Sequence, residues 1–484
     1  MEWFGFALLI MVAVGIIATG LPAAVVLMAV AAFGAVTGVA VGAVDAATLW
    51  ALPSRLINLL ENDLLQALPL YVTMGLLLDR LPVADALYRG AQAVLPRKPS
   101  APLVSGMLLG ALLGPMNGSV GASVLALSRV VAPRLAAEGI AAPHRQAIVA
   151  VASTLGVLVP PSLVLILLSD AMLSAHTIAV TVTGRTDRVV NTQDIFHAAL
   201  VPAGIFLVFC LALSWVVGRN ATRLPDRAAL TAAQGWTAAI ALISLLVLLG
   251  GVALGYFYAV EAAAMGAFAL LVAGLLSGRL RGKAMDELLR DAIALTGALF
   301  SLLLAATTFT MILRLLGTAD LAGKLVSFIP GGDLVAVAVV LGAIALSAFV
   351  LDAFEIIFVI VPIVIPPLLI RVADARWVSV LVLLTLQSSF LLPPFGYALM
   401  MVRGVLKEPV AFRAFLRALA PFLAAQWFLL LLVLLFPQLT HLGKPSDEGS
   451  RLAPANLSDG EFNRRLNEMI KLPESETDSG SVGR

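Results

Sequence analysis

The sequence contains little charge and almost no cysteine. Of its 484 residues, only 12% are Asp, Glu, Lys or Arg and 61% are hydrophobic, whereas in soluble domains about a quarter of the residues are charged. The 31 basic and 29 acidic residues nearly balance, so they give no reason to expect a nucleic-acid partner. Cys210 is the only cysteine, which excludes an internal disulfide and disfavours thiol chemistry. With a mean hydropathy of +1.02, the composition predicts that a lipid bilayer is the solvent.

Signals of catalysis are equally scarce. No glycine-rich loop followed by Lys and Ser or Thr is present to cradle a phosphate. Asp352 and Glu355 are the only close acidic pair within an apolar stretch, and no histidine accompanies them. The four histidines lack the spacing of metal ligands; they are His144, His176, His197 and His441. The sequence therefore predicts no enzyme and no organic cofactor, and because no basic region precedes a short apolar core at its start, no cleaved signal peptide.

Hydropathy predicts an all-α protein with about ten membrane spans. The expected spans are 3–20, 23–44, 64–78, 146–168, 196–217, 234–255, 257–278, 292–316, 377–399 and 421–436. Two further apolar stretches, 102–131 and 334–370, are each interrupted near the middle by polar residues, Gly or Pro. That pattern is typical of a helical hairpin that enters the membrane and returns on the same side.

The basic loops predict the orientation, because short loops rich in Lys and Arg stay in the cytoplasm. Those loops contain Arg80, Arg89, Arg97, Lys98, Arg134, Arg145, Arg219, Arg223, Arg227, Arg279, Arg281, Lys283, Arg290, Arg403, Lys407, Arg413 and Arg417. The first hairpin then opens from the cytoplasm and the second from outside. Both termini and the expected loop 175–194 lie outside.

A repeat follows from this order. Each half has three spans, a hairpin and two more spans, so the second half must be inverted with respect to the first. Asn117 precedes Pro160 by 43 positions, and Asp352 precedes Pro393 by 41. The predicted domains are residues 1–218, residues 219–436 and a polar tail, 437–484, with a short helix expected at 461–470.

Two Pro-Pro pairs lie deep within apolar spans, Pro160-Pro161 and Pro393-Pro394. Proline removes an amide donor and clashes with the preceding turn, so two in succession should unwind the helix. Unwound backbone at membrane depth lines a cavity or is buried in protein, and its free carbonyls can coordinate a cation. The alternative is a simple kink, but two motifs at matching positions favour binding.

The turn of the first hairpin is rich in small and neutral polar residues. Asn117, Ser119 and Ser123 offer oxygens suited to a hard cation or a carboxylate ligand, and Gly118 allows a close backbone approach. Small residues equally form helix-packing surfaces, so packing is the alternative reading.

Carboxylates are rare in the predicted spans. Asp352 and Glu355 stand three apart in the second hairpin, where a charge costs on the order of 3 kcal/mol and normally faces a cavity or a partner. Asp352 either caps the second arm of that hairpin or serves an ion site, or both. Glu261 begins a span, where it favours the helix start or couples an ion.

The chain resembles the large membrane subunit of tripartite ATP-independent periplasmic (TRAP) transporters, within the ion transporter superfamily of elevator-type carriers. The resemblance covers 4–436 and is specific only through its ordered set of motifs. These are the Asn117-Gly-Ser turn, Ser153-Thr-Leu-Gly156, Val159-Pro-Pro-Ser162, Glu261-Ala-Ala-Ala264, Leu351-Asp352 and Leu392-Pro-Pro-Phe-Gly396. Leu95-Pro-Arg-Lys98 and Phe395-Gly-Tyr-Ala-Leu399 are similar to the mannitol/chloroaromatic-like branch, which also includes carriers of keto acids and lactate.

The resemblance implies a sodium-driven importer of a small organic acid or related polar solute in a bacterial inner membrane. It implies a scaffold and a moving transport domain, a small four-helix membrane subunit and a periplasmic substrate-binding protein. Sodium ions are expected near Ser119 and Asp352. The residues expected to bind substrate or sodium are Asn117, Gly118, Ser119, Ser123, Thr154, Gly156, Pro160, Pro161, Asp352, Glu355, Leu392, Pro393, Pro394 and Gly396, with Glu261 as a further candidate.

Two positions depart from the family pattern. Leu392 and Val260 stand where the family usually has threonine, so the second sodium site lacks a hydroxyl at Leu392. The alternative function is a stand-alone sodium/anion symporter of the same superfamily without a receptor protein. The sequence does not name the substrate, because a receptor would perform most of the selection, and it sets neither the sodium stoichiometry, the oligomeric state nor the role of the tail.

Overall fold

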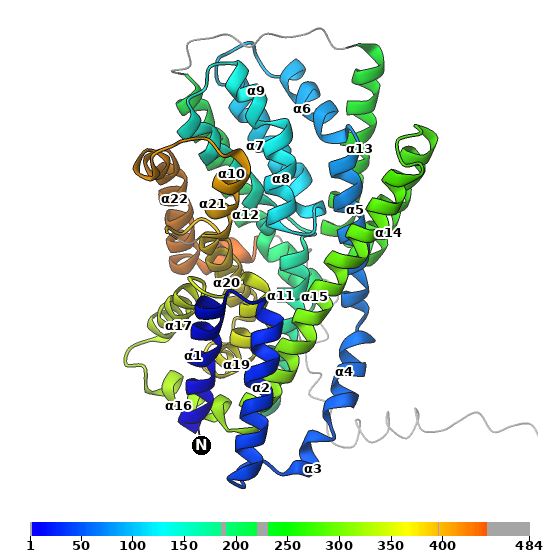
Figure 1. The fold of residues 1–484 in the computed structure, drawn as a ribbon. Coiled ribbons are helices and arrows are strands. Elements are labelled where there is room, and N and C mark those ends of the chain that lie inside the picture. The colour runs from blue at the N-terminus through cyan, green and yellow to red at the C-terminus, as the bar shows by residue number, and fades with distance from the viewer. Residues whose placement is uncertain (1, 185–189, 220–230, 395, 443–484) are drawn as a thin grey trace, which may run out of the picture. The chain divides into compact units, whose positions relative to one another are not determined.

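A computed structural model describes residues 2–184, 190–219, 231–394 and 396–442. Within these ranges all regular structure is helical, as Figure 1 shows. The expected helix at 461–470, the basic residues Arg223 and Arg227, and Phe395 lie outside the described residues.

The helices of the first half include two that frame the expected hairpin and two that flank the first Pro-Pro pair. They are α1 (Glu2–Thr19), α2 (Ala23–Ala40), α3 (Ala46–Leu49), α4 (Leu52–Leu60), α5 (Asp63–Arg80), α6 (Val83–Val94), α7 (Ala101–Leu113), the 3-10 turn η1 (Gly114–Met116), α8 (Val120–Val130), α9 (Ala132–Ala137), α10 (Ala142–Leu158), α11 (Leu163–Thr183) and α12 (Thr192–Gly218).

The second half repeats a hairpin and a helix break at the Pro-Pro pair. Its helices are α13 (Ala232–Ala253), α14 (Ala259–Leu276), α15 (Lys283–Leu315), α16 (Thr318–Phe328), α17 (Asp333–Ser347), α18 (Ala353–Glu355), the π-helix η2 (Ile356–Ile360), α19 (Val361–Arg371), α20 (Ala375–Ser389), α21 (Tyr397–Leu406), α22 (Phe412–Leu435) and the 3-10 helix η3 (Pro437–Thr440).

By length and composition, nine of the described helical segments could cross a membrane, or ten if the bent pair α5 and α6 is one span. This agrees with the expected number of about ten, but the membership differs. The second arms of both hairpins pass the test, as Val120–Ala137 and Ala353–Arg371. The short helices α1 and α20 do not pass it. In the case of α20, the helix ends after 15 residues, at Ser389, shortly before the Pro-Pro pair. Re-entry of the hairpins stays a prediction.

Two expected boundaries were wrong. The loop 175–194 is helical as far as Thr183. Its polar residues do not end the helix, because Thr177 and Thr181 donate their hydroxyls to carbonyls four residues earlier, at 2.8 Å in both cases. At the other end of the chain, Pro437–Thr440 was expected in the solvated tail, yet it forms η3 with Thr440 buried and so belongs to the helical body.

Several short helices were not predicted from the sequence. The nine-residue α4 and the twelve-residue α6 each have one apolar and one polar face, and α3, α9 and α16 are four to eleven residues long. A hydropathy window of about 19 residues averages over such elements and misses them.

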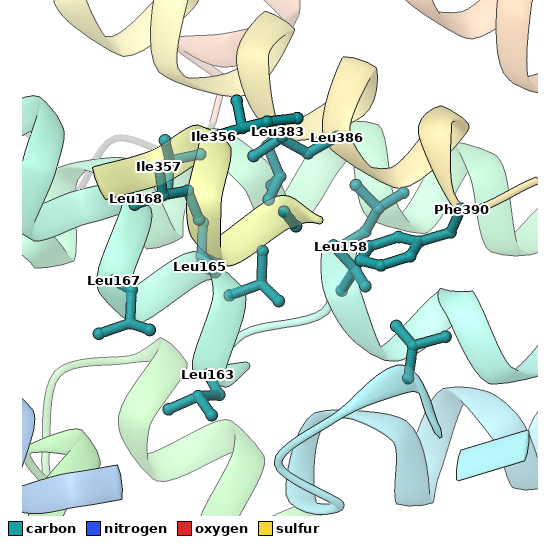
Figure 2. Close-up of a cluster of buried hydrophobic side chains, with 14 of the residues drawn as sticks. Leu158, Leu163, Leu165, Leu167, Leu168, Ile356, Ile357, Leu383, Leu386 and Phe390 are labelled. Atoms are coloured by element: carbon teal, nitrogen blue, oxygen red, sulfur yellow. The ribbon is translucent and has the colours of Figure 1, made fainter. Parts of the chain in front are cut away.

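The core joins the two breaks. Figure 2 shows Leu165 and Leu168 of α11 near Ile356 and Ile357 of η2, with Leu383 of α20 nearby. In these five side chains at most 1% of the surface is exposed. Leu158 and Phe390, which lie at the ends of α10 and α20, approach each other beside this cluster (Figure 2). Close van der Waals packing of these side chains therefore holds both helix breaks at one place in the fold, because in a bilayer helices associate through packing rather than through exclusion of water.

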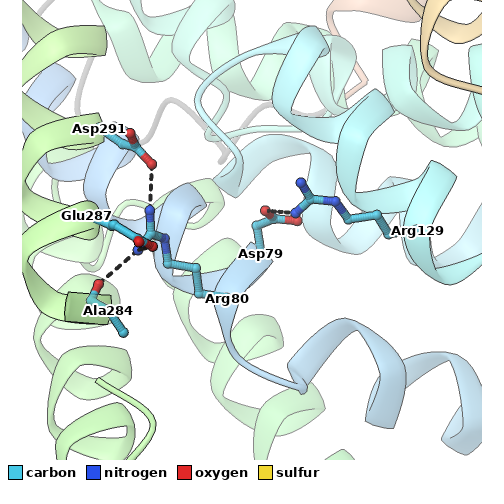
Figure 3. Close-up of polar contacts among 6 residues, drawn as sticks. All are labelled: Asp79, Arg80, Arg129, Ala284, Glu287 and Asp291. Carbon is cyan, nitrogen blue, oxygen red and sulfur yellow. Dashed lines mark hydrogen bonds and ion pairs between the residues drawn. The ribbon is translucent and has the colours of Figure 1, made fainter. Parts of the chain in front are cut away.

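Ion pairs fasten α5 to its neighbours at one end (Figure 3). Arg80 donates to the carbonyl of Ala284 at 2.8 Å and pairs with Asp291, both on α15. The preceding residue, Asp79, accepts from Arg129 of α8 at 2.6 Å. Adjacent residues of α5 thus bind the long helix α15 and the second arm of the first hairpin.

Candidate functional site

The turn of the first hairpin is held by its own polar side chains. Asn117 donates from Nδ2 to Oγ of Ser123 at 3.1 Å, and Ser123 donates to the carbonyl of Ser119 at 3.2 Å. Oγ of Ser119 accepts from the N–H of Ala122 at 3.1 Å, so Ser119 is the N-cap of α8. Gly118 has φ +68°, a conformation that favours glycine. These four residues form one compact turn.

Glycines let this turn touch the first broken helix. A Cβ added to Gly156 of α10 would lie 2.2 Å from the carbonyl carbon of Gly114, and one added to Gly114 would lie 2.6 Å from Cα of Gly156. One turn earlier, a Cβ on Gly110 would lie 2.3 Å from the carbonyl oxygen of Ala152. No side chain fits between these backbones, so the hairpin and α10 are in direct main-chain contact.

The first Pro-Pro pair separates α10 from α11, and its peptide bond is cis. Ser162 follows the pair and connects both sides of the break. Its hydroxyl donates to the carbonyl of Val157 at 2.9 Å and accepts from the N–H of Leu165 at 3.1 Å. Pro160 and Pro161 thus lie in an unwound segment, as the sequence predicts, between a helix end and a helix start.

A small cavity lies where the turn meets this break. It has a volume of about 10 Å³, room for roughly one water-sized sphere. The lining combines glycines and serines with apolar residues and contains no carboxylate. It consists of Gly114, Pro115, Gly118, Ser119, Val120, Ser123, Ser153, Gly156, Val157, Ser162, Leu163 and Val164. Four predicted site residues therefore share one cavity: Gly118, Ser119, Ser123 and Gly156.

The second break has a similar backbone arrangement. The Pro393-Pro394 peptide is cis and lies between α20 and α21. Gly396 donates its N–H to the carbonyl of Leu392 at 2.8 Å, and a Cβ on Gly396 would lie 2.7 Å from the carbonyl oxygen of Phe390. Leu392 is half-buried and contributes only backbone polar groups at this turn. Phe395, between the proline pair and Gly396, lies outside the described residues.

The second hairpin places its two carboxylates at the start of its second arm. Glu355 accepts through Oε2 from the N–H of Asp352 at 3.1 Å, and Asp352 precedes α18 as its N-cap residue. Within the described part of the chain, Oδ1 of Asp352 is buried and has no hydrogen-bond partner. The π-helix η2 follows directly, and π-helical turns are rare and frequent at functional sites. Neither carboxylate lines the small cavity.

Two residues that sequence reasoning missed connect the halves. Gln387 of α20 donates to Oγ1 of Thr154 on α10 at 3.4 Å, and both side chains are fully buried. Tyr397, the first residue of α21, lies against α8, because a Cβ on Gly121 would be 2.6 Å from its hydroxyl. Thr154 therefore follows Ser153, which lines the cavity, and Tyr397 lies against the second arm of the first hairpin.

Ser153 and Ser162 stand in two of the family motifs but were not predicted to bind substrate or sodium, yet both line the cavity. The sequence gives little signal for Ser153, because its hydroxyl bonds the carbonyl of Ala150 at 2.7 Å, as any helical serine can. The amide of Gln387 within an apolar run is a clearer signal. The further candidate Glu261 lies elsewhere in the fold. It is exposed and accepts from the N–H of Tyr258 at 2.9 Å at the start of α14.

Only neutral oxygens and one buried acidic pair are available to hold an ion here. No group of three or more His, Cys, Asp or Glu that could bind a transition metal occurs within the residues described. Hydroxyl and carbonyl oxygens suit hard cations, whereas soft metals prefer sulfur and imidazole. The chemistry of the donor set therefore fits an alkali or alkaline-earth cation better than zinc or copper.

The sequence matches one family over most of its length. The sequence model of the family described as "Tripartite ATP-independent periplasmic transporter, DctM component" matches residues 8–439. A relative from Rhodobacter capsulatus, "C4-dicarboxylate TRAP transporter large permease protein DctM", is 24% identical over 278 residues, which are 56% of this chain and 62% of the relative. The aligned part thus spans less than two thirds of that protein.

The fold also has a solved counterpart. The YdaH transporter of Alcanivorax borkumensis, whose crystal structure is described as having an unusual topology, matches with a TM-score of 0.60. The match has 16% sequence identity and covers 83% of this chain and 91% of the other, so it supports the fold alone. The chain is a multi-pass protein of the bacterial inner membrane, and the matching family is one of transporter components rather than of enzymes. With a family match that runs from residue 8 to residue 439, it belongs to the DctM component family of tripartite ATP-independent periplasmic transporters.

Proposed function

We propose that this permease imports a small organic acid by coupling its movement to sodium. One observation carries the proposal: the first hairpin turn and the first helix break form a small cavity, with room for about one ion, whose lining includes four serines and no carboxylate. Sodium is a hard monovalent cation that needs several oxygens but no strong negative charge. Ser119, Ser123 and Ser153 supply such oxygens, and carbonyls freed at Pro160-Pro161 add to them.

Helix ends that meet at this junction support the binding of a cation and of an anion. The ends of η1 and α10 direct carbonyls toward the junction, which favours a cation. The starts of α8 and α11, capped by Ser119 and Ser162, direct N–H groups toward it, which favours a carboxylate. Sodium and an organic acid can therefore neutralise each other at one junction.

The second half supplies the other sodium site. Asp352 contributes a buried carboxylate oxygen without a partner in the described structure, and backbone groups near Leu392 and Gly396 stand where the family has a threonine hydroxyl. The second site therefore depends on Asp352 and backbone oxygens. Residues 1–218 and 219–436 act as inverted repeats, in which both hairpins and breaks belong to a transport domain that moves against a scaffold.

We infer the substrate class and the partners from the likeness to this family. The relative from Rhodobacter capsulatus is named for C4-dicarboxylates, and the motifs also resemble the branch that carries keto acids and lactate. The substrate of this chain is accordingly a small carboxylate, delivered by a periplasmic binding protein. A small four-helix membrane subunit completes the transporter.

Uptake by proteoliposomes tests this function. The complex of this chain with its small subunit is reconstituted, and entry of radiolabelled succinate, pyruvate and lactate is measured with and without the binding protein and an inward sodium gradient. Uptake should require both the gradient and the binding protein. Undiminished uptake of free substrate without the binding protein would favour the stand-alone sodium/anion symporter, and uptake without sodium would refute sodium coupling.

A further inference from the structure

A second polar cavity lies away from both helix breaks and has not been used by the proposed function. It is bounded by α4, α11, α15 and the second arm of the second hairpin, and its volume is about 160 Å³. Figure 1 shows α4 beside the lower part of the long helix α15. The polar side chains of its lining are Arg55, Asp170, Ser174, Thr307, Thr310 and Arg314. We refer to it as the arginine cavity.

The charges in the arginine cavity do not balance. Arg55 and Arg314 both line it and are close enough for their positive charges to interact. Asp170 is the single carboxylate of the lining, and it accepts from Nδ2 of Asn62 at 3.2 Å. Within the described ranges, no salt bridge within 4.0 Å joins either arginine to a carboxylate. One positive charge is left over, which a single ligand carboxylate would balance.

Arg314 contacts the opposite wall of the arginine cavity. Its Nη2 lies 3.4 Å from the carbonyl oxygen of Pro362, a weak hydrogen bond. One turn earlier on α15, Thr310 donates to the carbonyl of Phe358 at 2.8 Å, within the π-helix η2. A charged side chain in a spanning helix is costly and normally faces a partner or a water-filled space. The remaining donors of Arg314 are therefore available to a ligand.

The arginine cavity lies beyond the candidate site on two elements that start there. Asp170 is seven residues after the start of α11, about 10 Å along the helix. Phe358 and Pro362 follow Asp352 by a similar length on the second hairpin. At the other end Arg55 is exposed, so the cavity opens to the side where α4 lies. Asp170, which an anion would approach past Arg55, is therefore about two helical turns from the first break.

We propose that the arginine cavity binds an organic carboxylate on its way to the site between the hairpins. Guanidinium groups bind carboxylates with two parallel hydrogen bonds, and the hydroxyls of Ser174 and Thr307 would receive further polar groups of the ligand. The proposal rests on the proposed function for the identity of the ligand as an organic acid. The preference of the arginine cavity for anions does not depend on the proposed function, and it can be measured without a transport assay.

Thiol labelling measures this preference. Ser174→Cys and Thr307→Cys are each introduced into the full chain carrying Cys210→Ser, because the native cysteine is the only other thiol. Reaction rates with anionic sulfonatoethyl methanethiosulfonate and cationic trimethylammonioethyl methanethiosulfonate are divided by the rates with free mercaptoethanol. The corrected rate should be about tenfold higher for the anionic reagent. Succinate in excess should slow labelling, whereas the same concentration of choline chloride should not.

Charge variants separate this role from a structural one. Arg314→Gln and Arg55→Gln should each reduce the preference for the anionic reagent several-fold, and Arg314→Lys should keep most of it. Size-exclusion profiles and thermal unfolding monitor folding of each variant. Equal corrected rates for the two reagents, no effect of the Gln variants, or no reaction at either cysteine would overturn the proposal. Because labelling needs neither sodium nor the binding protein, a failed uptake assay alone would refute the proposed function and leave the arginine cavity standing.

Discussion

Replacing Gly156 by alanine should force apart the two backbones that form the small cavity. The added Cβ would lie 2.2 Å from the carbonyl carbon of Gly114, whereas carbon atoms normally approach to about 3.5 Å. The neighbouring atoms belong to the main chain, so no side-chain rotation relieves the overlap. One of the two elements must move by about 1 Å, and overpacking of this kind costs about 3 kcal/mol or more.

The matched control is Gly204→Ala on α12, where nothing lies within 4 Å of the added Cβ. Alanine is favoured over glycine in a helix by about 1 kcal/mol, so this variant should be as stable as the parent or slightly more so. In thermal unfolding in detergent, the melting temperature of Gly156→Ala should be roughly 3–6 °C below that of the control. Sodium titrations of uptake should also show a higher half-saturating concentration, because the shift deforms a cavity of about 10 Å³. Equal stability of the two variants would show that α10 and the hairpin do not touch as described.

The remaining predictions concern the two sodium sites and the orientation of the chain. Ser119→Ala should lower the apparent sodium affinity of uptake several-fold without lowering the melting temperature by more than a few degrees. Leu392→Thr should leave that affinity unchanged or increase it, because the threonine adds a side-chain oxygen where only backbone oxygens are available. If Ser119→Ala leaves the sodium dependence intact while Leu392→Thr abolishes uptake, the assignment of the sites is wrong. Arg281→Cys should react with membrane-impermeant maleimide only from the cytoplasm, and Gly332→Cys, at the start of the second hairpin, only from outside. Labelling of both from the same side would contradict the inverted arrangement.

The features that sequence reasoning identified are those with local physical causes. Proline disfavours a helix interior for local reasons, and both Pro160-Pro161 and Pro393-Pro394 lie at helix breaks, as expected. Pro366-Pro367 remains inside α19, so a proline pair alone does not decide where a helix breaks. The glycine in the Asn117-Gly-Ser turn permits a positive φ, and the turn adopts it. Long apolar runs need a bilayer and a helix, so the number of spans was also predictable. The register of hydroxyl groups within those runs carried no comparable signal, because a serine inside a helix satisfies itself on a nearby carbonyl.

Tertiary structure decided which of these features meet. The contact of Gly114 with Gly156 and the hydrogen bond of Gln387 to Thr154 join residues far apart in the sequence. Both depend on how helices pack, for which the chain has no local signature. The same holds for Arg55 and Arg314, which are 259 positions apart and belong to different predicted halves, yet line one cavity. Composition and backbone chemistry therefore determined the solvent, the helices and their breaks. The grouping of oxygens and charges into sites came from packing, because long-range contacts depend on the shapes of whole helices rather than on any single residue.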